Sequence, residues 1–197
     1  AWRVIVEIIF AAWVLLALMA PEYRPKKSAI LYAFAAFLVI IGLANIFGVA
    51  PVKSFWSNYE RMEGYVLLLH LGAFFLVTGS VFKEMDWKRW WNTTLVASFI
   101  MILYSAFQLA GTIQINQGGA RVDGTLGNAT YLAVYMLFHI FIALLFLWRE
   151  KKNTSLRWIY TLLILAQVWV LYHTATRGAI LGLIGGLLIV AILNVRN

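Results

Sequence analysis

The 197-residue chain is too hydrophobic for a soluble globular protein, because 63% of its residues are hydrophobic and only 12% are charged. This composition is typical of a protein that crosses the membrane several times. The net charge of +8 therefore reflects membrane topology and contact with anionic lipid headgroups, and it does not indicate a nucleic-acid partner. The absence of cysteine excludes disulfides, thiol catalysis and a metal site with cysteine ligands.

Apolar segments of about 20 residues predict an all-α, polytopic transmembrane bundle of about seven spans. They cover residues 2–20, 29–47, 64–82, 93–112, 129–148, 158–173 and 177–193. The last two are expected to form a tight hairpin. No repeat or linker marks a boundary, so residues 1–197 are predicted to be one transmembrane domain. Because the chain lacks an initiator Met and ends directly after a span, we expect it to be part of a longer protein.

Basic residues divide the connections between spans into two sets. The connections around residues 24–27, 83–89 and 149–157 hold most of the Lys and Arg residues. They are expected to face the cytoplasm, because positively charged loops are retained there. The loops 48–63 and 113–128 and the break at 174–176 would then lie on the opposite, extracytoplasmic side.

The break between the last two spans places Arg177 in the first turn of a predicted helix. A cation is disfavoured at a helix N-terminus, since that end already carries partial positive charge. A bound anion would reverse this penalty, because amide N–H groups and the guanidinium would converge on it. The alternative is an interfacial Arg that marks the end of a span. His173 lies at the same membrane face.

The two extracytoplasmic loops carry further candidate residues: Arg61 and Glu63 in the first, and Arg121, Asp123 and Asn128 in the second. Arg, amides and aromatic residues on one face suit a site for a sugar and a pyrophosphate, although the aromatics equally suit an interfacial belt. No phosphate-binding loop, zinc-protease motif or nucleophile elbow is present, so we expect no metal and no cofactor.

Polar residues also interrupt the predicted spans. A hydrogen bond between helices is the expected role for these residues, ahead of a place in a transport pathway: Glu7, His70, Gln108, His139 and Gln167. Gly178, Gly182 and Gly186 are spaced for close helix packing.

Three stretches resemble the bacterial O-antigen ligase and polymerase superfamily. The segment RVDGTLGNATYLAVY, residues 121–135, is similar to the family pattern R-x-x-G-T-x-G-N-x-N-x-L-A-x-Y, although the usual NPN reads Asn128-Ala129-Thr130. The segment TATRGAILG, residues 174–182, is similar to (S/T)-R-G-A-x-L-G. Upstream, SFWSNYERMEGYVLLLH, residues 54–70, resembles the loop and helix start of ligase-like members.

The resemblance implies an inverting, metal-independent glycosyltransferase of the bacterial cytoplasmic membrane. It would move a glycan from an undecaprenyl-diphosphate carrier to an acceptor glycan or glycolipid on the extracytoplasmic face. Arg177 and Arg121 would be the catalytic residues that hold the diphosphate. Arg61 would assist, and the other candidates for substrate binding are Glu63, Asp123, Asn128 and His173. The family's large loop with its functional His is absent, so this chain alone should be inactive.

Two other functions remain open at this point. A transporter or flippase of a lipid-linked or anionic solute would also place arginines near a membrane face. It should show matching halves and charges near the membrane midplane, which this sequence lacks. A noncatalytic scaffold is the third possibility.

Overall fold

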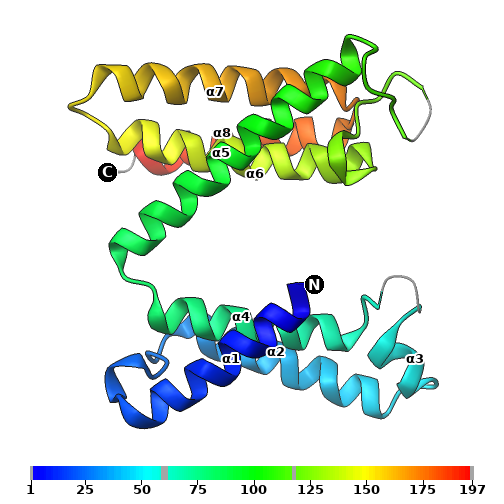
Figure 1. Cartoon of the computed structure of the whole chain (residues 1–197), viewed down its shortest axis with the longest axis vertical. Coiled ribbons are helices and arrows are strands. Elements are labelled where there is room, and N and C mark those ends of the chain that lie inside the picture. Colours follow the sequence, from blue (N-terminus) through cyan, green and yellow to red (C-terminus); the bar gives the residue numbers. More distant parts are fainter. Residues whose placement is uncertain (1, 59–61, 117–118, 196–197) are drawn as a thin grey trace. The chain divides into compact units, whose positions relative to one another are not determined.

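The computed structural model describes residues 2–58, 62–116 and 119–195, and these residues form helices and connecting loops (Figure 1). The α-helices are α1 (Trp2–Met19), α2 (Ala29–Ile46), α3 (Pro51–Trp56), α4 (Tyr65–Val81), α5 (Glu84–Leu109), α6 (Ala129–Arg149), α7 (Thr154–His173) and α8 (Arg177–Val195). Two short 3-10 helices, η1 (Pro21–Tyr23) and η2 (Gly124–Leu126), lie in loops. The predicted all-α class is confirmed.

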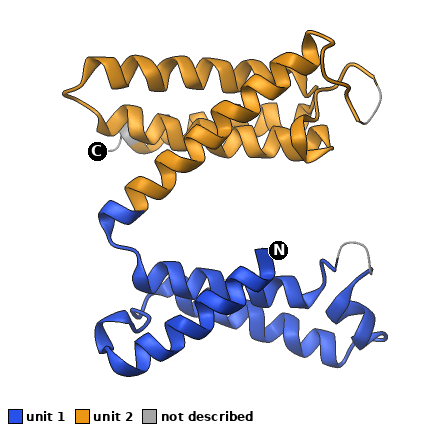
Figure 2. Ribbon diagram, viewed as in Figure 1, with its two compact units in different colours: residues 1–86 blue, residues 87–197 orange. Residues whose placement is uncertain are grey.

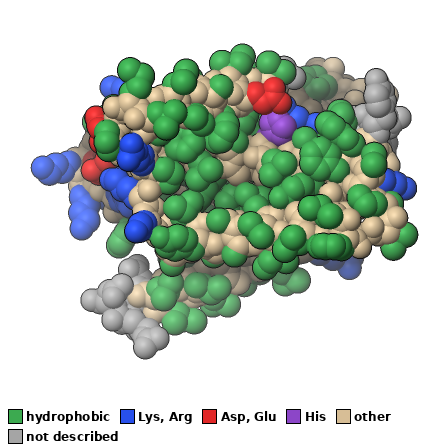
Figure 3. All heavy atoms as spheres, turned by 90° about the horizontal axis from the view of Figure 1, so that it is seen from below, with side chains coloured by type: hydrophobic (Ala, Val, Ile, Leu, Met, Phe, Trp, Pro, Cys, Tyr) green, Lys and Arg blue, Asp and Glu red, His purple; other side chains and the backbone are tan. Residues whose placement is uncertain are grey.

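Five helices, α1, α2, α5, α6 and α7, are long and apolar enough to cross a membrane, and α4 and α8 are shorter apolar helices. They coincide with the seven predicted segments, and the chain is a multi-pass membrane protein. On the face shown in Figure 3, hydrophobic side chains cover most of the surface, while Lys and Arg side chains gather toward one end.

Helix α5 is offset from its predicted apolar segment, 93–112, because it begins at Glu84. Glu84 and Asp86 occupy its first turn, where negative charge favours a helix start, and Asp86 Oδ2 accepts a hydrogen bond from the Lys83 amide at 3.0 Å. The helix also ends earlier than predicted, at Leu109, because Gly111 adopts a left-handed conformation with φ of 76°.

The chain divides into two compact units, residues 1–86 and residues 87–197 (Figure 2). The single transmembrane domain stays a prediction. In the first unit, α4 packs against α1 and α2. Gly72 allows the close approach of α2, since a Cβ there would lie 2.8 Å from Leu38 Cδ1.

The second unit is built on the antiparallel pair α6 and α7. Its core includes side chains from both helices and from α5, among them Leu132, Ile140, Leu171 and Ile102. Polar contacts also join α5 to α7, because Gln167 Nε2 donates to Ser98 Oγ at 2.9 Å. A hydrogen bond between helices was the role expected of Gln167.

The α6–α7 connection is closed by local hydrogen bonds. Glu150 Oε1 accepts from the amides of Asn153 at 3.0 Å and Lys152 at 3.2 Å. These bonds, that of Asn153 first, lower the pKa of the Glu150 carboxyl from its ordinary value. Asn153 Oδ1 in turn caps α7 by accepting from the Leu156 amide at 3.1 Å.

Helix α8 packs on α6 through part of its glycine series. A Cβ on Gly186 would lie 2.4 Å from Phe141 Cζ, and one on Gly182 would lie 3.3 Å from Leu137 Cδ2. Gly178 and Gly185 have no heavy atom within 4 Å of such a Cβ. Two glycines of the predicted seam therefore allow close packing of the helices, and the third lies in open space.

We expect Gly186→Leu to destabilise the protein by about 1–3 kcal/mol, because the new side chain overlaps the Phe141 ring. Gly185→Leu, which adds the same side chain one position away, should have little effect. Thermal unfolding of the purified protein in detergent measures the difference. Equal melting of both variants would contradict this packing of α6 and α8.

Candidate functional site

The turn between α7 and α8 consists of residues 174–176 and is tight, as expected. Ala175 has φ of 49°, a left-handed conformation that costs energy for a residue with a Cβ. The fully buried Thr174 holds the turn, since its amide donates to the Val170 carbonyl at 3.1 Å and its hydroxyl to the Leu171 carbonyl at 2.7 Å. Arg177 is the first residue of α8.

Arg121 connects the loop before α6 to this turn. Its Nε donates to the Thr174 carbonyl at 2.9 Å, and its Nη2 donates to Thr176 Oγ1 at 3.1 Å. The next amide, that of Val122, donates to the His173 carbonyl at 3.3 Å. The segments 121–135 and 174–182 therefore lie together at one end of the second unit, although Arg121 and Thr174 are 53 positions apart along the chain.

Asp123 lies below the surface of the same loop and has no exposed area. Its Oδ1 accepts from Gln108 Nε2 at 2.7 Å, at the end of α5. Gln108 Oε1 also accepts from the Gly124 amide at 2.8 Å. Gly124 is required here, because its φ is 57° and a Cβ would lie 2.9 Å from Met101 Sδ.

Gln108 is the residue of this site that sequence reasoning missed. It was expected to join two transmembrane helices, and its side chain instead binds the loop between α5 and α6. The signal in the sequence was the position of Gln108 in the last turn of its apolar segment, next to a loop whose backbone N–H groups can donate to a side chain.

Arg177 is exposed, and the structure shows no hydrogen bond or ion pair for its guanidinium among the described residues. Thr176, which precedes it, uses its hydroxyl to accept from Arg121 and to donate to the Thr174 carbonyl at 3.3 Å. The Thr176 side chain therefore does not cap the first amides of α8. The Ala179 amide is bonded to the Thr176 carbonyl at 3.1 Å, which leaves the amides of Arg177 and Gly178 beside the guanidinium. A guanidinium next to the first amides of a helix is an arrangement that binds anions.

His173 and Asn128 lie at the same end of the second unit. His173 Nδ1 is bonded to the Trp169 carbonyl at 2.9 Å, and the imidazole contacts the Trp169 and Tyr172 rings. Because a carbonyl only accepts, Nδ1 carries the proton, and Nε2 is the acceptor of the neutral ring. Asn128 caps α6, since its Oδ1 accepts from the Thr130 amide at 2.8 Å.

The remaining candidates are not brought together with these residues. Arg61 lies outside the described residues, and Glu63 belongs to the first unit, whose position relative to the second is not defined. The structure therefore describes the candidate site through Arg121, Asp123, Asn128, His173 and Arg177.

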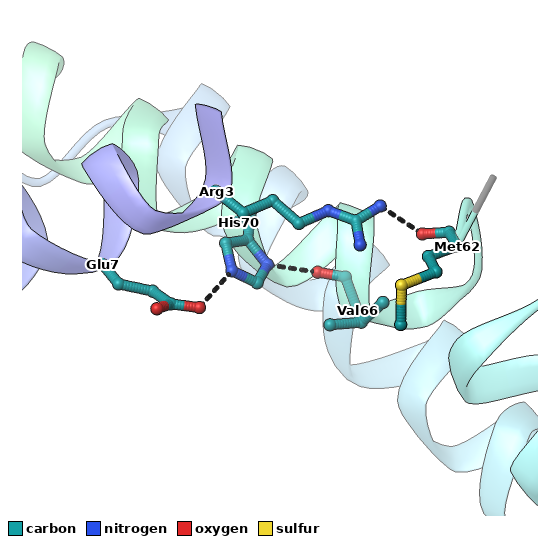
Figure 4. A network of polar contacts seen from close by, with 5 residues as sticks. All are labelled: Arg3, Glu7, Met62, Val66 and His70. Atoms are coloured by element: carbon teal, nitrogen blue, oxygen red, sulfur yellow. Dashed lines mark hydrogen bonds and ion pairs between the residues drawn. The ribbon is translucent and has the colours of Figure 1, made fainter. Parts of the chain in front are cut away.

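The first unit has its own polar network, shown in Figure 4. His70 Nδ1 is bonded to the Val66 carbonyl at 2.7 Å, and Nε2 lies 2.9 Å from Glu7 Oε1. Arg3 donates to the Met62 carbonyl. Both imidazole nitrogens are engaged, so His70 has no free nitrogen to act as a base. The network instead joins α1 to α4, as expected for Glu7 and His70.

Within the described ranges, no group of three His, Asp or Glu side chains is placed to hold a metal ion. The candidate site therefore consists of guanidinium groups, backbone amides and one buried carboxylate–amide pair. The search for similar proteins found no family model, no curated protein and no solved structure that matches this chain.

Proposed function

We propose that the chain is the membrane-embedded part of an O-antigen ligase-like glycosyltransferase. It would take a glycan from an undecaprenyl-diphosphate carrier and join it to an acceptor glycan or glycolipid. The observation that supports this most is the contact of Arg121 with Thr174 and Thr176, which joins two of the three segments that resemble this family. The site would lie on the extracytoplasmic face of a bacterial cytoplasmic membrane.

The proposed reaction needs a cation at the leaving group. The acceptor hydroxyl oxygen forms a bond to the anomeric carbon, and the bond between that carbon and the diphosphate oxygen breaks. The electron pair leaves with the diphosphate, so negative charge builds on its oxygens in the transition state. Arg177 suits this role, because its fork is not occupied by another described residue and can make two parallel hydrogen bonds.

Arg121 and Asp123 would act differently from Arg177. Arg121 uses Nε and Nη2 to hold the turn, which leaves Nη1 for the diphosphate. Asp123 is buried and bonded to Gln108, so its carboxylate would position the loop and not contact the sugar directly. The proton of the acceptor hydroxyl would go to a general base.

A reconstitution experiment tests this function against a transporter or flippase. The complete protein is placed in liposomes that contain undecaprenyl-diphosphate glycan and a glycolipid acceptor. We expect glycan to appear on the acceptor, with release of undecaprenyl diphosphate in equal amount. Movement of the intact lipid-linked glycan between leaflets without transfer would reject the transferase and support the transporter.

A further inference from the structure

Gln108 lies in the last turn of α5, and its side chain binds the loop that carries Arg121 on both sides of that residue. Besides its bonds to Asp123 and Gly124, its Nε2 donates to the Gln114 carbonyl at 3.2 Å. The side chain is 3% exposed and uses both amide donors and one acceptor lone pair. One side chain thus binds the loop between α5 and α6 both before and after Arg121, at Gln114 and at Asp123 and Gly124.

The loop between α5 and α6 is attached to the protein on two sides. On one side Gln108 binds it to α5, and on the other Arg121 and Val122 bind it to the α7–α8 turn. The buried Asp123 carboxylate needs a hydrogen-bond donor, because burying a charged group without one costs free energy of folding. The Gln108 amide provides that donor at 2.7 Å.

We infer that Gln108 is a positioning residue for glycan transfer, which fixes Arg121 against the α7–α8 turn by binding Gln114, Asp123 and Gly124 to the end of α5. The role of Gln108 in glycan transfer rests on the proposed function. The closure of the loop onto the end of α5 rests only on the hydrogen bonds of the amide.

The direction of these hydrogen bonds gives a sharp test. Gln108→Glu keeps size and shape, but it replaces the donor to Asp123 with an acceptor and puts two carboxylates in contact. Adding Asp123→Asn reverses the polarity of the pair, since the new amide can donate to the new carboxylate. The Gly124 amide keeps its acceptor, while the bond to the Gln114 carbonyl is lost. The double variant should therefore recover most of what the single variant loses.

Hydrogen exchange of the Val122 and Gly124 amides in the purified complete protein measures the closure without any glycan. Both amides are bonded in the structure. We expect exchange about 10–100-fold faster in Gln108→Glu, in line with the loss of a hydrogen bond to a charged group, and recovery in the double variant. Gln114→Glu is the control, because it adds a charge in the same loop while its backbone carbonyl stays in place. Slow exchange in Gln108→Glu, or fast exchange in the double variant, would overturn the closure.

Glycan transfer by the same proteins then tests the positioning role. We expect transfer to fall about 10-fold or more in Gln108→Glu and to recover together with exchange in the double variant. Wild-type transfer in Gln108→Glu despite fast exchange would overturn the positioning role, as would recovered exchange without recovered transfer. If exchange follows the expected order but the wild-type protein transfers no glycan, the proposed function fails and the closure stands.

Discussion

Arg177→Ala is expected to lower glycan transfer by about 10²–10³-fold while the protein folds and accumulates normally. The substitution removes a hydrogen-bond donor to the diphosphate oxygens, on which negative charge develops in the transition state. Stability should not fall, because the structure shows no partner for the guanidinium among the described residues and because a cation at a helix N-terminus is disfavoured by about 0.3–1 kcal/mol. The measurement is transfer by the complete protein, normalised to the amount of folded protein in the membrane.

Arg177→Lys separates charge from geometry at the same position. An interfacial Arg that only marks the end of a span could be replaced, since Lys keeps the charge and reaches the headgroups equally well. A diphosphate ligand needs the planar fork, so we expect a loss of about 1.5–3 kcal/mol, or roughly 10–100-fold in rate. Wild-type transfer in Arg177→Lys would reject the diphosphate role.

Arg149→Ala is the matched control for both Arg177 variants. Arg149 is also exposed and lies in the last turn of α6, outside the candidate site. Its removal should leave transfer unchanged. A similar loss in Arg149→Ala would mean that transfer responds to the total charge of the protein and not to Arg177.

The helical architecture could be predicted from the sequence, because each apolar segment must satisfy its own backbone hydrogen bonds in the membrane. The α5 boundary could not be read from hydropathy, since Lys88 and Arg89 make its first turns polar although they are helical. The signal for that boundary was local: acidic residues in the first turn favour a helix start. Pro51 likewise marks the start of the short helix α3, which no apolar segment announces.

The candidate site could be predicted only in outline. Arg121 and Arg177 were expected on one membrane face, and the structure places the loop of Arg121 on the turn before Arg177. The individual hydrogen bonds could not be foreseen, because they depend on how α5 packs beside α7. Burial of Asp123 against Gln108 is such a consequence of tertiary packing, since neither residue is apolar. Whether these residues bind a diphosphate stays a prediction.

Arg121→Ala is expected to lower both stability and transfer, in contrast to Arg177→Ala. The substitution removes the hydrogen bonds to the Thr174 carbonyl and the Thr176 hydroxyl. Because Arg121 is exposed and solvent weakens such bonds, we expect a loss of about 1–2 kcal/mol in the free energy of unfolding. Thermal unfolding and transfer by the complete protein measure the two effects.

Thr176→Val distinguishes the structural role of Arg121 from a chemical one. It removes the hydroxyl that accepts from Nη2 and donates to the Thr174 carbonyl, while Nε keeps its bond to that carbonyl and the guanidinium remains in the site. If Arg121 also binds the diphosphate, Thr176→Val should lose part of the stability and little of the transfer, whereas Arg121→Ala should lose transfer well beyond its loss of folded protein. If transfer per folded molecule is the same in both variants, Arg121 serves only to hold the α7–α8 turn, and Arg177 is then the guanidinium of the described candidate site that is left for the leaving group.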